Sequence, residues 1–317
     1  MADEVEELSQ LRDARPSQTD VVARVPTGQF PTSVAVADVS GDGKPDIIVA
    51  NEVGNTVSVL LGNGDGTLQA RVDYPTGDTP LSVKVVDVSG DGKPDIIVAS
   101  LGTTEVNVLL GNGDGTFRAK VNYPTGAGTW AVAVADVNGD GKPDLEVANI
   151  SDRTASVLLG NGDGTFQART DYLIGSQPIS IAVVDVNGDG KPDLVTTTNT
   201  GGNIRNAVSV MLGVGDGTFL AKADYATGPD PTSVTVADVS GDGVPDLVTT
   251  NNSAGTASVL LGNGDGTFQA KVDYATGSGP MSVAVADVNG DGRPDLLVAN
   301  QGSSTVSVLL GTGNGRF

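Results

Sequence analysis

Six copies of one acidic, nine-residue segment carry the residues of this sequence that could do chemistry. The first copy is DVSGDGKPD, from Asp38 to Asp46, and the later copies begin after successive spacings of 49, 49, 49, 53 and 49 residues. Every copy has Asp at positions 1, 5 and 9, Ser or Asn at position 3, and Gly at positions 4 and 6. Oxygens on alternate residues of a curled loop are hard ligands that suit Ca²⁺, and glycine permits the positive φ of such a curl. We therefore expect each segment to bind one calcium ion.

Position 7 of the segment should contribute only its backbone carbonyl, because its side chain is Lys, Val or Arg. The alternative is a set of acidic turns that hold no ion. Two carboxylates about 4 Å apart repel by roughly 1 to 4 kcal/mol, so three in each of six copies favour the calcium interpretation. The predicted ligands are, in chain order, Asp38, Ser40, Asp42, Lys44, Asp46, Asp87, Ser89, Asp91, Lys93, Asp95, Asp136, Asn138, Asp140, Lys142, Asp144, Asp185, Asn187, Asp189, Lys191, Asp193, Asp238, Ser240, Asp242, Val244, Asp246, Asp287, Asn289, Asp291, Arg293 and Asp295.

The amino-acid composition excludes several kinds of catalytic site, metal site and partner. The chain has 317 residues, a net charge of −21, no cysteine and no histidine. These absences exclude Ser-His-Asp and Cys-His catalysis, zinc bound by Cys or His, and disulfide bonds. An acidic surface disfavours nucleic acid and anionic membranes as partners. No catalytic constellation is visible, so we expect no enzyme activity, and no apolar run is long enough for membrane insertion.

The segments around each acidic loop predict short strands. In the first unit, residues 33–39 alternate with period two, and residues 46–51 are apolar enough to form a strand buried on both faces. Residues 56–61 predict a third strand and residues 68–74 a more polar fourth. Between them, residues 62–67 (GNGDGT) are interpreted as a tight turn, because they offer too few side-chain oxygens for a metal site. Four antiparallel strands in a unit of 49 residues match the size of a β-propeller blade.

The two ends of the sequence predict how the ring closes. The sixth unit stops at Phe317, where its fourth strand should begin, and VVARVPTG near the N-terminus matches QARVDYPTG of the first unit. We therefore expect an all-β, six-bladed propeller of four-stranded antiparallel blades over residues 21–317. Residues 21–26 would pair with the strand near 305–311 and complete the last blade. An open stack of hairpins is the alternative.

The repeated units resemble FG-GAP (VCBS-type) repeats, the family that builds the β-propeller of integrin α subunits and of many bacterial extracellular proteins. The resemblance covers about residues 21–317, and its most specific part is GDGxPD followed by an apolar strand in all six copies. It implies a propeller with Ca²⁺ between the first and second strands of each blade. The sequence departs from the integrin pattern by having six units in place of seven and Ser at position 3 of three loops.

The resemblance and the loops together predict a binding or scaffolding module of the adhesion type, with about six structural Ca²⁺ ions. We expect it to be extracellular or at a cell surface and monomeric, with residues 1–20 as a tail or short helix that lacks a signal peptide. Its partner would be a protein or glycan on the face opposite the calcium loops. The alternatives are a lectin, a lyase or hydrolase acting on polysaccharide, and an engineered or recently amplified ring without an evolved ligand.

Variation between the units locates a possible ligand face. One position near the start of each first strand should lie in a ring around the central channel, and it is occupied by Thr32, Leu81, Trp130, Ile179, Thr232 and Met281. Trp130, Leu81, Ile179 and Met281 are the candidate ligand residues, with Trp130 as anchor; alternatively, Trp130 merely fills the channel mouth. Glu146 stands where the other units have Ile, Val or Leu, and a buried carboxylate there needs a partner or a raised pKa.

Overall fold

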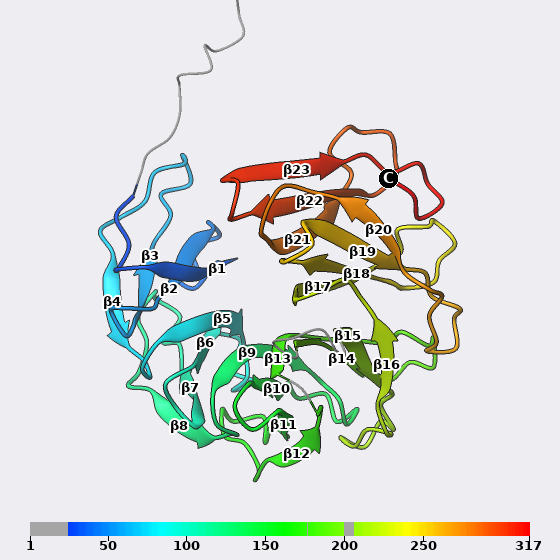
Figure 1. Ribbon diagram of the computed structural model, residues 1–317. Helices are drawn as coiled ribbons and strands as arrows, with labels where there is room; N and C mark the ends of the chain where they lie inside the picture. Colours follow the sequence, from blue (N-terminus) through cyan, green and yellow to red (C-terminus); the bar gives the residue numbers. More distant parts are fainter. Residues whose placement is uncertain (1–24, 176, 200–205) are drawn as a thin grey trace, which may run out of the picture.

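The computed structural model describes residues 25–175, 177–199 and 206–317, which form 23 strands in six antiparallel sheets and no helix (Figure 1). The expected all-β architecture is therefore confirmed for these residues, and five of the six antiparallel sheets have the expected four strands, whereas the sixth has three. The tail or helix expected at residues 1–20 lies outside the described residues. In the ranges that the structure describes, no helix could span a membrane.

Each sheet takes its strands in chain order. The first contains β1 (Pro31–Ala37), β2 (Asp46–Asn51), β3 (Thr56–Leu60) and β4 (Val72–Pro75), and the second β5 (Pro80–Val86), β6 (Asp95–Ser100), β7 (Glu105–Leu109) and β8 (Val121–Pro124). The third contains β9 (Thr129–Ala135), β10 (Asp144–Asn149), β11 (Thr154–Leu158) and β12 (Thr170–Leu173), and the fourth β13 (Gln177–Val184), β14 (Asp193–Asn199), β15 (Ala207–Met211) and β16 (Ala223–Ala226). The fifth contains β17 (Pro231–Ala237), β18 (Asp246–Asn251), β19 (Thr256–Leu260) and β20 (Val272–Ala275), and the sixth β21 (Pro280–Ala286), β22 (Asp295–Asn300) and β23 (Thr305–Leu309).

The six sheets stand around a common centre, with the first strand of each sheet innermost, as in a β-propeller (Figure 1). Consecutive inner strands contact one another from β1 and β5 through to β17 and β21. The second strands lie at the middle of each sheet, and β6 and β10 are buried at every residue. Their apolar composition explains this position, because a strand between two packed sheets has no solvent face.

Five hydrophobic clusters fill the five junctions between neighbouring sheets. The cluster between the first two sheets joins Val57 of β3 to Val83 of β5 and Ile96 of β6. Each junction also pairs a tyrosine of a fourth strand with a phenylalanine of the next sheet. Tyr74 and Phe117 pack edge to face with ring centroids 5.5 Å apart, and four equivalent pairs follow. Such a pair contributes about 0.5 to 1.5 kcal/mol beyond its buried area.

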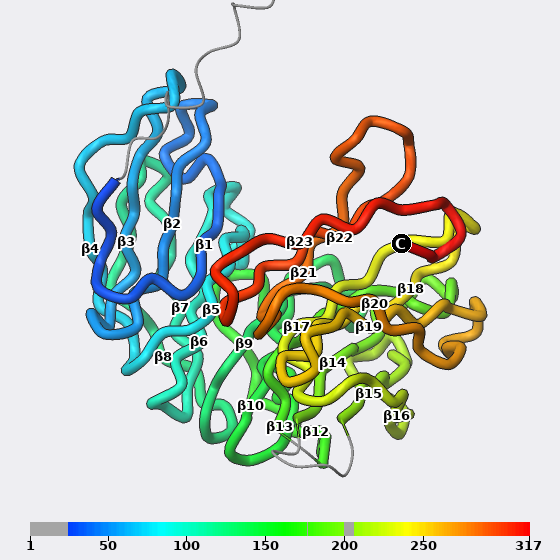
Figure 2. Tube along the Cα trace, turned by 45° about the horizontal axis from the view of Figure 1, so that its top comes forward, coloured from blue at the N-terminus to red at the C-terminus, as the bar shows by residue number. Residues whose placement is uncertain are grey.

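The first and sixth sheets stand on either side of a break in the ring, which we call the seam (Figures 1 and 2). Valines that face the seam are exposed: Val34 of β1 by 63% and Val306 of β23 by 64%. Their counterparts at a closed junction, Val83 and Val106, are exposed by 3% and 0%. Among the described residues, β23 pairs only with β22. Residues 21–24 of the expected closing strand lie outside the described residues, so ring closure stays a prediction.

Candidate metal loops and central cavity

Each acidic loop joins the first and second strands of its sheet and curls around the carboxylate at position 1. In the first loop, Asp38 accepts hydrogen bonds from the backbone N–H groups of Gly41 and Gly43, both at 2.7 Å. Gly41 and Gly43 have φ of 73° and 80°, where a side chain would strain the backbone. The same pair of hydrogen bonds to position 1 recurs in the other five loops.

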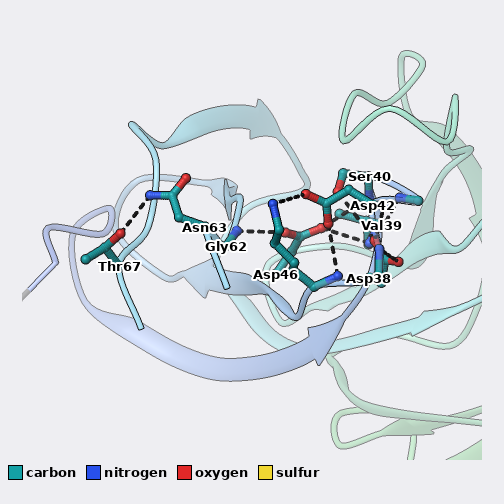
Figure 3. A network of polar contacts seen from close by, with 11 residues as sticks. Asp38, Val39, Ser40, Asp42, Asp46, Gly62, Asn63 and Thr67 are labelled. Carbon is teal, nitrogen blue, oxygen red and sulfur yellow. Dashed lines mark hydrogen bonds and ion pairs between the residues drawn. The ribbon is translucent and has the colours of Figure 1, made fainter. Parts of the chain in front are cut away.

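The aspartate at position 9 lies beneath the loop and ties it to the next turn. Asp46 is fully buried; its Oδ2 accepts the N–H of Val39 at 2.9 Å, and its Oδ1 accepts the N–H of Gly62 at 2.8 Å (Figure 3). Burial raises the pKa of its counterparts Asp95, Asp144, Asp193 and Asp246, although their N–H partners oppose the rise.

Position 5 is the outermost carboxylate of the loop. Asp42 accepts the N–H of Lys44 at 3.0 Å and forms an ion pair with the Lys44 ammonium at 3.0 Å, and these contacts lower the pKa of Asp42. The three other loops with Lys at position 7 have the same pair, at 3.4 to 3.9 Å. Exposed pairs of this kind stabilise little, so the lysine does not remove the loop's need for positive charge.

The residue at position 3 divides the loops into two kinds. In the Asn loops, the Asn138 side-chain oxygen accepts the N–H of Asp140 at 2.9 Å, and the other two Asn loops share this bond. In the Ser loops, the Ser40 hydroxyl instead donates to Asp38 at 3.4 Å. Asn at position 3 therefore accepts the N–H of position 5, whereas Ser at position 3 contacts the aspartate at position 1.

The donor chemistry of the loops fits a hard cation. Three carboxylates, a hydroxyl or amide oxygen and a carbonyl are the ligands of calcium sites. In the described part of the chain, no three acidic side chains converge closely enough to hold a metal ion. The carboxylates face loop N–H groups instead. In the first loop, Asp38 Oδ1 and Asp46 Oδ2 each accept two of these N–H groups, whereas Asp38 Oδ2 accepts only that of Gly43 and keeps a second lone pair for a cation. Calcium therefore stays a prediction that the donor set supports.

The GNGDGT segment forms the tight turn that the sequence predicts. Asp65 accepts both the N–H and the hydroxyl of Thr67, at 2.9 and 2.6 Å, and Gly62 bridges to Leu68 across the turn. Gly64 lies directly against Lys44, so this turn and the acidic loop share one end of the molecule.

A central cavity of about 900 Å³ lies at the opposite end of the molecule. Trp130, Leu81 and Met281 line it, as the sequence predicts, together with Thr32 and Thr232 from the same position in other units. Ile179 is not among its lining residues, although it holds the same position in the fourth unit.

Phe30 and Glu52 also line the cavity, and neither is among the candidate ligand residues predicted from the sequence. Phe30 precedes β1 with φ of 54° and is 70% exposed. Glu52 follows β2, and its N–H bonds to the Phe30 carbonyl at 2.8 Å, which places the two residues side by side. The sequence does distinguish Phe30, because this large apolar residue stands where the second and fifth units have the polar residues Thr79 and Asp230.

Glu146 is an ionisable side chain at a position that is apolar in the other units. It is fully buried in β10, and neither carboxylate oxygen has a hydrogen-bond partner. Burial, followed by the charge of Asp144, raises its pKa well above the usual value. The expected rise of the pKa is therefore present, and among the described residues the carboxylate has no hydrogen-bond partner.

The repeated units match a known family of protein repeats. A family model described as FG-GAP-like repeat matches residues 38–98, 87–147, 145–196, 197–249 and 241–298. No curated protein matches the sequence.

Several solved structures are similar. One is an Agrocybe aegerita lectin described as specifically recognising non-reducing terminal N-acetylglucosamine; identity is 25%, coverage is 90% of this chain and 78% of that chain, and the TM-score is 0.63. The Vibrio cholerae biofilm matrix protein Bap1 shares 21% identity over 85% of this chain and 44% of that chain, with a TM-score of 0.52. Virginiamycin B lyase from Staphylococcus aureus shares 14% identity over 92% and 85%, with a TM-score of 0.62. The last two likenesses concern the fold alone.

Proposed function

Because this chain belongs to the FG-GAP-like repeat family, we propose that it is a calcium-stabilised β-propeller that serves as an extracellular binding or scaffolding module. The observation that carries the proposal is the sixfold recurrence of one loop curled around an aspartate. The proposed protein is a monomer without catalytic activity, and its partner is a protein or glycan rather than nucleic acid or membrane.

Calcium would act here by stabilising the fold. Asp38, Ser40, Asp42 and Asp46, with the carbonyl of Lys44, would hold the ion in the first loop, and it would offset their mutual repulsion. Asp46 already ties the loop to Gly62, so ordering the loop also orders the turn between β3 and β4. A ligand that binds only the folded state stabilises it by mass action, and affinities of about 10⁻⁴ to 10⁻³ M suffice outside cells.

Thermal unfolding with and without divalent ions tests this role. We expect the melting temperature to rise when Ca²⁺ is added to chelator-treated protein and to fall again in excess EGTA. Mg²⁺ at the same concentration should substitute poorly, because it demands a smaller octahedral site. An unchanged melting temperature in EGTA would refute the structural role of calcium.

We also propose that the ring has six blades and is closed by residues 21–26. The five described junctions each pair a Tyr with a Phe, whereas at the sixth the aligned residues are Val25 and Leu68. At this junction, aliphatic residues therefore replace both the tyrosine and the phenylalanine. Val25 and Leu68 also line one cavity of about 540 Å³, which supports the assignment of Val25 to the place of the missing tyrosine.

An engineered disulfide tests the closure, since the chain has no cysteine of its own. In the first sheet Ser58 pairs with Asp73, so the aligned residues Ser307 and Arg24 should face each other in the sixth. We expect the R24C/S307C variant to form an intramolecular disulfide under mild oxidation, and the off-register R24C/V308C control to do so much less. Equal yields from both pairs would refute this register, and disulfide-linked dimers would indicate closure between two chains.

Carbohydrate binding is the second candidate function. The likeness to the Agrocybe aegerita lectin, at 25% identity over 90% of this chain, favours it. A glycan array containing terminal N-acetylglucosamine tests it, with chelator-treated protein as the control for calcium dependence. Binding to no glycan would leave the protein-binding scaffold as the proposal.

A further inference from the structure

Neighbouring sheets contact each other through the acidic loop of one sheet and the turn that follows the third strand of the next. The N–H of Gly115, in the turn of the second sheet, donates to the carbonyl of Val39 in the first loop at 3.0 Å. Three more junctions have the same bond at 3.1 to 3.2 Å, from Gly164 to Val88, from Gly217 to Val137 and from Gly315 to Val239. At the remaining described junction, the turn glycine Gly266 lies against Asn187 of the fourth loop. In all four bonds the acceptor is position 2 of the loop, between two predicted calcium ligands.

A leucine reinforces each of these contacts. Leu61, which follows β3, packs on Gly115 so closely that an added Cβ would come within 2.7 Å of the leucine side chain, and only glycine fits there. The same fit recurs at the other four described junctions, at Gly164, Gly217, Gly266 and Gly315. The valines at position 2 of the first five loops are each 1% exposed. Loop, turn and leucine therefore form one buried contact at each of these junctions.

At the seam, the two halves of this contact are separate. Val288, at position 2 of the sixth loop, is 49% exposed, and Leu310, the counterpart of Leu61, is 52% exposed. Apart from its chain neighbours, no described atom lies within 4 Å of the place that a Cβ on Gly66 would take in the turn of the first sheet. Closure in the manner of the other junctions would direct the Gly66 N–H to the Val288 carbonyl and place Leu310 on Gly66.

The position of the Val288 carbonyl depends on the carboxylates of the sixth loop. Oδ2 of Asp295 accepts the N–H of Val288 at 3.0 Å, and Asp287 accepts those of Gly290 and Gly292 at 2.7 and 2.8 Å. Among the described residues, Asp291 has no ion pair, whereas position 5 of the first four loops has one with a lysine. Three carboxylates around one backbone segment repel each other unless a cation offsets their charge. A bound cation would therefore hold the Val288 carbonyl in place.

The seam also differs from the other junctions in its chain connectivity. At the five described junctions the two sheets are consecutive in the chain, so a short connection keeps loop and turn together. The seam joins the first sheet to the sixth, and the entropic cost of bringing the ends of a chain together grows with its length. Of the six acidic loops, the sixth is the one whose neighbouring turn lies across the seam.

We propose that calcium binding at the sixth loop controls closure of the ring at the seam. The ion would order the loop that accepts the Gly66 N–H, and the docked turn would favour the liganded loop, because coupling between two sites is reciprocal. This inference rests on the proposed calcium binding and the proposed ring closure, and it assigns the connection between them to one loop.

A thiol introduced by Val306→Cys measures closure, because the chain has no cysteine and Val306 is 64% exposed on the seam but would be buried in the closed ring. Val106→Cys, at a closed junction, is the control for opening of the whole fold. We would follow maleimide labelling while calcium is added to chelator-treated protein. The ratio of the Val306→Cys rate to the Val106→Cys rate should fall by at least about tenfold at saturation, since labelling follows the open population.

Matched loop variants test whether the sixth loop is responsible. In the Val306→Cys protein, Asp291→Asn should raise the calcium concentration for half-maximal protection by about tenfold, because ligand charge sets calcium affinity. Asp140→Asn makes the same exchange in the third loop, which also has Asn at position 3 and whose partner Gly217 is bonded at 3.2 Å; the midpoint should move by less than about twofold. Equal shifts in both variants would mean that calcium acts through general stability, and would overturn the proposal.

The remaining outcomes separate this inference from the proposals on which it rests. Slow labelling of Val306→Cys with and without calcium would overturn calcium control but leave ring closure intact, whereas rapid labelling in saturating calcium would overturn both. Circular dichroism establishes that each variant is folded, and melting scans report the general stabilising role of calcium independently. Asn289→Ser, which introduces the position 3 residue of the first loop, is a milder second variant and should shift the midpoint in the same direction as Asp291→Asn.

Discussion

At the scale of single residues, Glu146 is the clearest conflict between local sequence and fold. Its two nearest strand partners are Val157 and Ala133, and burial leaves both carboxylate oxygens without hydrogen bonds. An unpaired buried polar group costs about 1 to 3 kcal/mol, and more if it is charged. The residue therefore lowers the stability of the third sheet.

Replacing Glu146 with valine, the residue at this position in the fourth and fifth units, should stabilise the protein by about 1 to 3 kcal/mol. Urea denaturation at neutral pH with calcium present measures the change. Glu146→Gln is the control, because it removes the charge but keeps a buried polar group, and its gain should be smaller. A valine variant less stable than the parent protein would indicate a buried partner for the carboxylate.

The position 3 residue of the acidic loops leads to a second prediction. An Asn oxygen can accept the position 5 N–H, as Asn138 does, and still offer a lone pair to an ion. Ser240→Asn should therefore tighten calcium binding at the fifth loop by about threefold to tenfold. Calorimetric titration with calcium should detect one tighter site, and the reverse change, Asn187→Ser, should weaken one. If neither exchange altered the titration, position 3 would not be a ligand.

At the scale of elements, a side-chain relay links the second, third and fourth strands of the first, third and fifth sheets. In the first sheet, Asn51 donates to Ser58 at 2.9 Å, and Ser58 donates to Asp73 of β4 at 2.6 Å. The second sheet has Ser100 and Asn107 at the first two positions, which exchanges the two residue types. Asn107 then reaches Asn122 at 2.9 Å and accepts the N–H of Gly77 at 2.6 Å.

This exchange predicts strong coupling between the two positions. Asn107→Ser alone leaves two short side chains where one must span the gap, and should destabilise the protein by about 1 to 3 kcal/mol. Adding Ser100→Asn should recover a large part of the loss, because it restores the arrangement of the first sheet. A double-mutant cycle from urea unfolding measures the coupling, expected to be about 1 kcal/mol or more. Strictly additive effects would mean that the relay does not act as a unit.

The sequence predicts the strands, loops and turns better than it predicts the cavity. The reason is the separation along the chain of the residues that determine each feature. The acidic loops, the buried second strands and the GNGDGT turn follow from residue types within a few positions, and all lie where expected. The lining of the cavity depends on how sheets far apart in sequence meet at the centre. The candidate ligand residues therefore did not include Phe30 and Glu52, and they included Ile179, which does not line the cavity.

At the scale of the whole molecule, the period of the repeats predicts six sheets, but it does not by itself predict how the ends meet. Five junctions each bury a hydrophobic cluster, and the two halves of a sixth are exposed on either side of the seam. Closing the seam would bury Val34 and Val306 as Val83 and Val106 are buried elsewhere. A buried valine is worth about 1.5 to 3 kcal/mol, so the exposed faces favour closure.

A lysine at Val306 distinguishes a closed ring from an open one. On an open seam the change is a surface substitution, which usually alters stability by less than about 0.5 kcal/mol. In a closed ring the lysine would be buried without a partner, and the free energy of unfolding should fall by several kcal/mol, on the order of 3. Val106→Lys, at a closed junction, gives the loss of stability expected for a fully buried lysine. Leu173→Lys, on the exposed strand β12, gives the loss expected for an exposed lysine. We expect Val306→Lys to resemble Val106→Lys in calcium-loaded protein, because residues 21–26 then complete the sixth blade; a loss no larger than that of Leu173→Lys would mean that the seam stays open in solution.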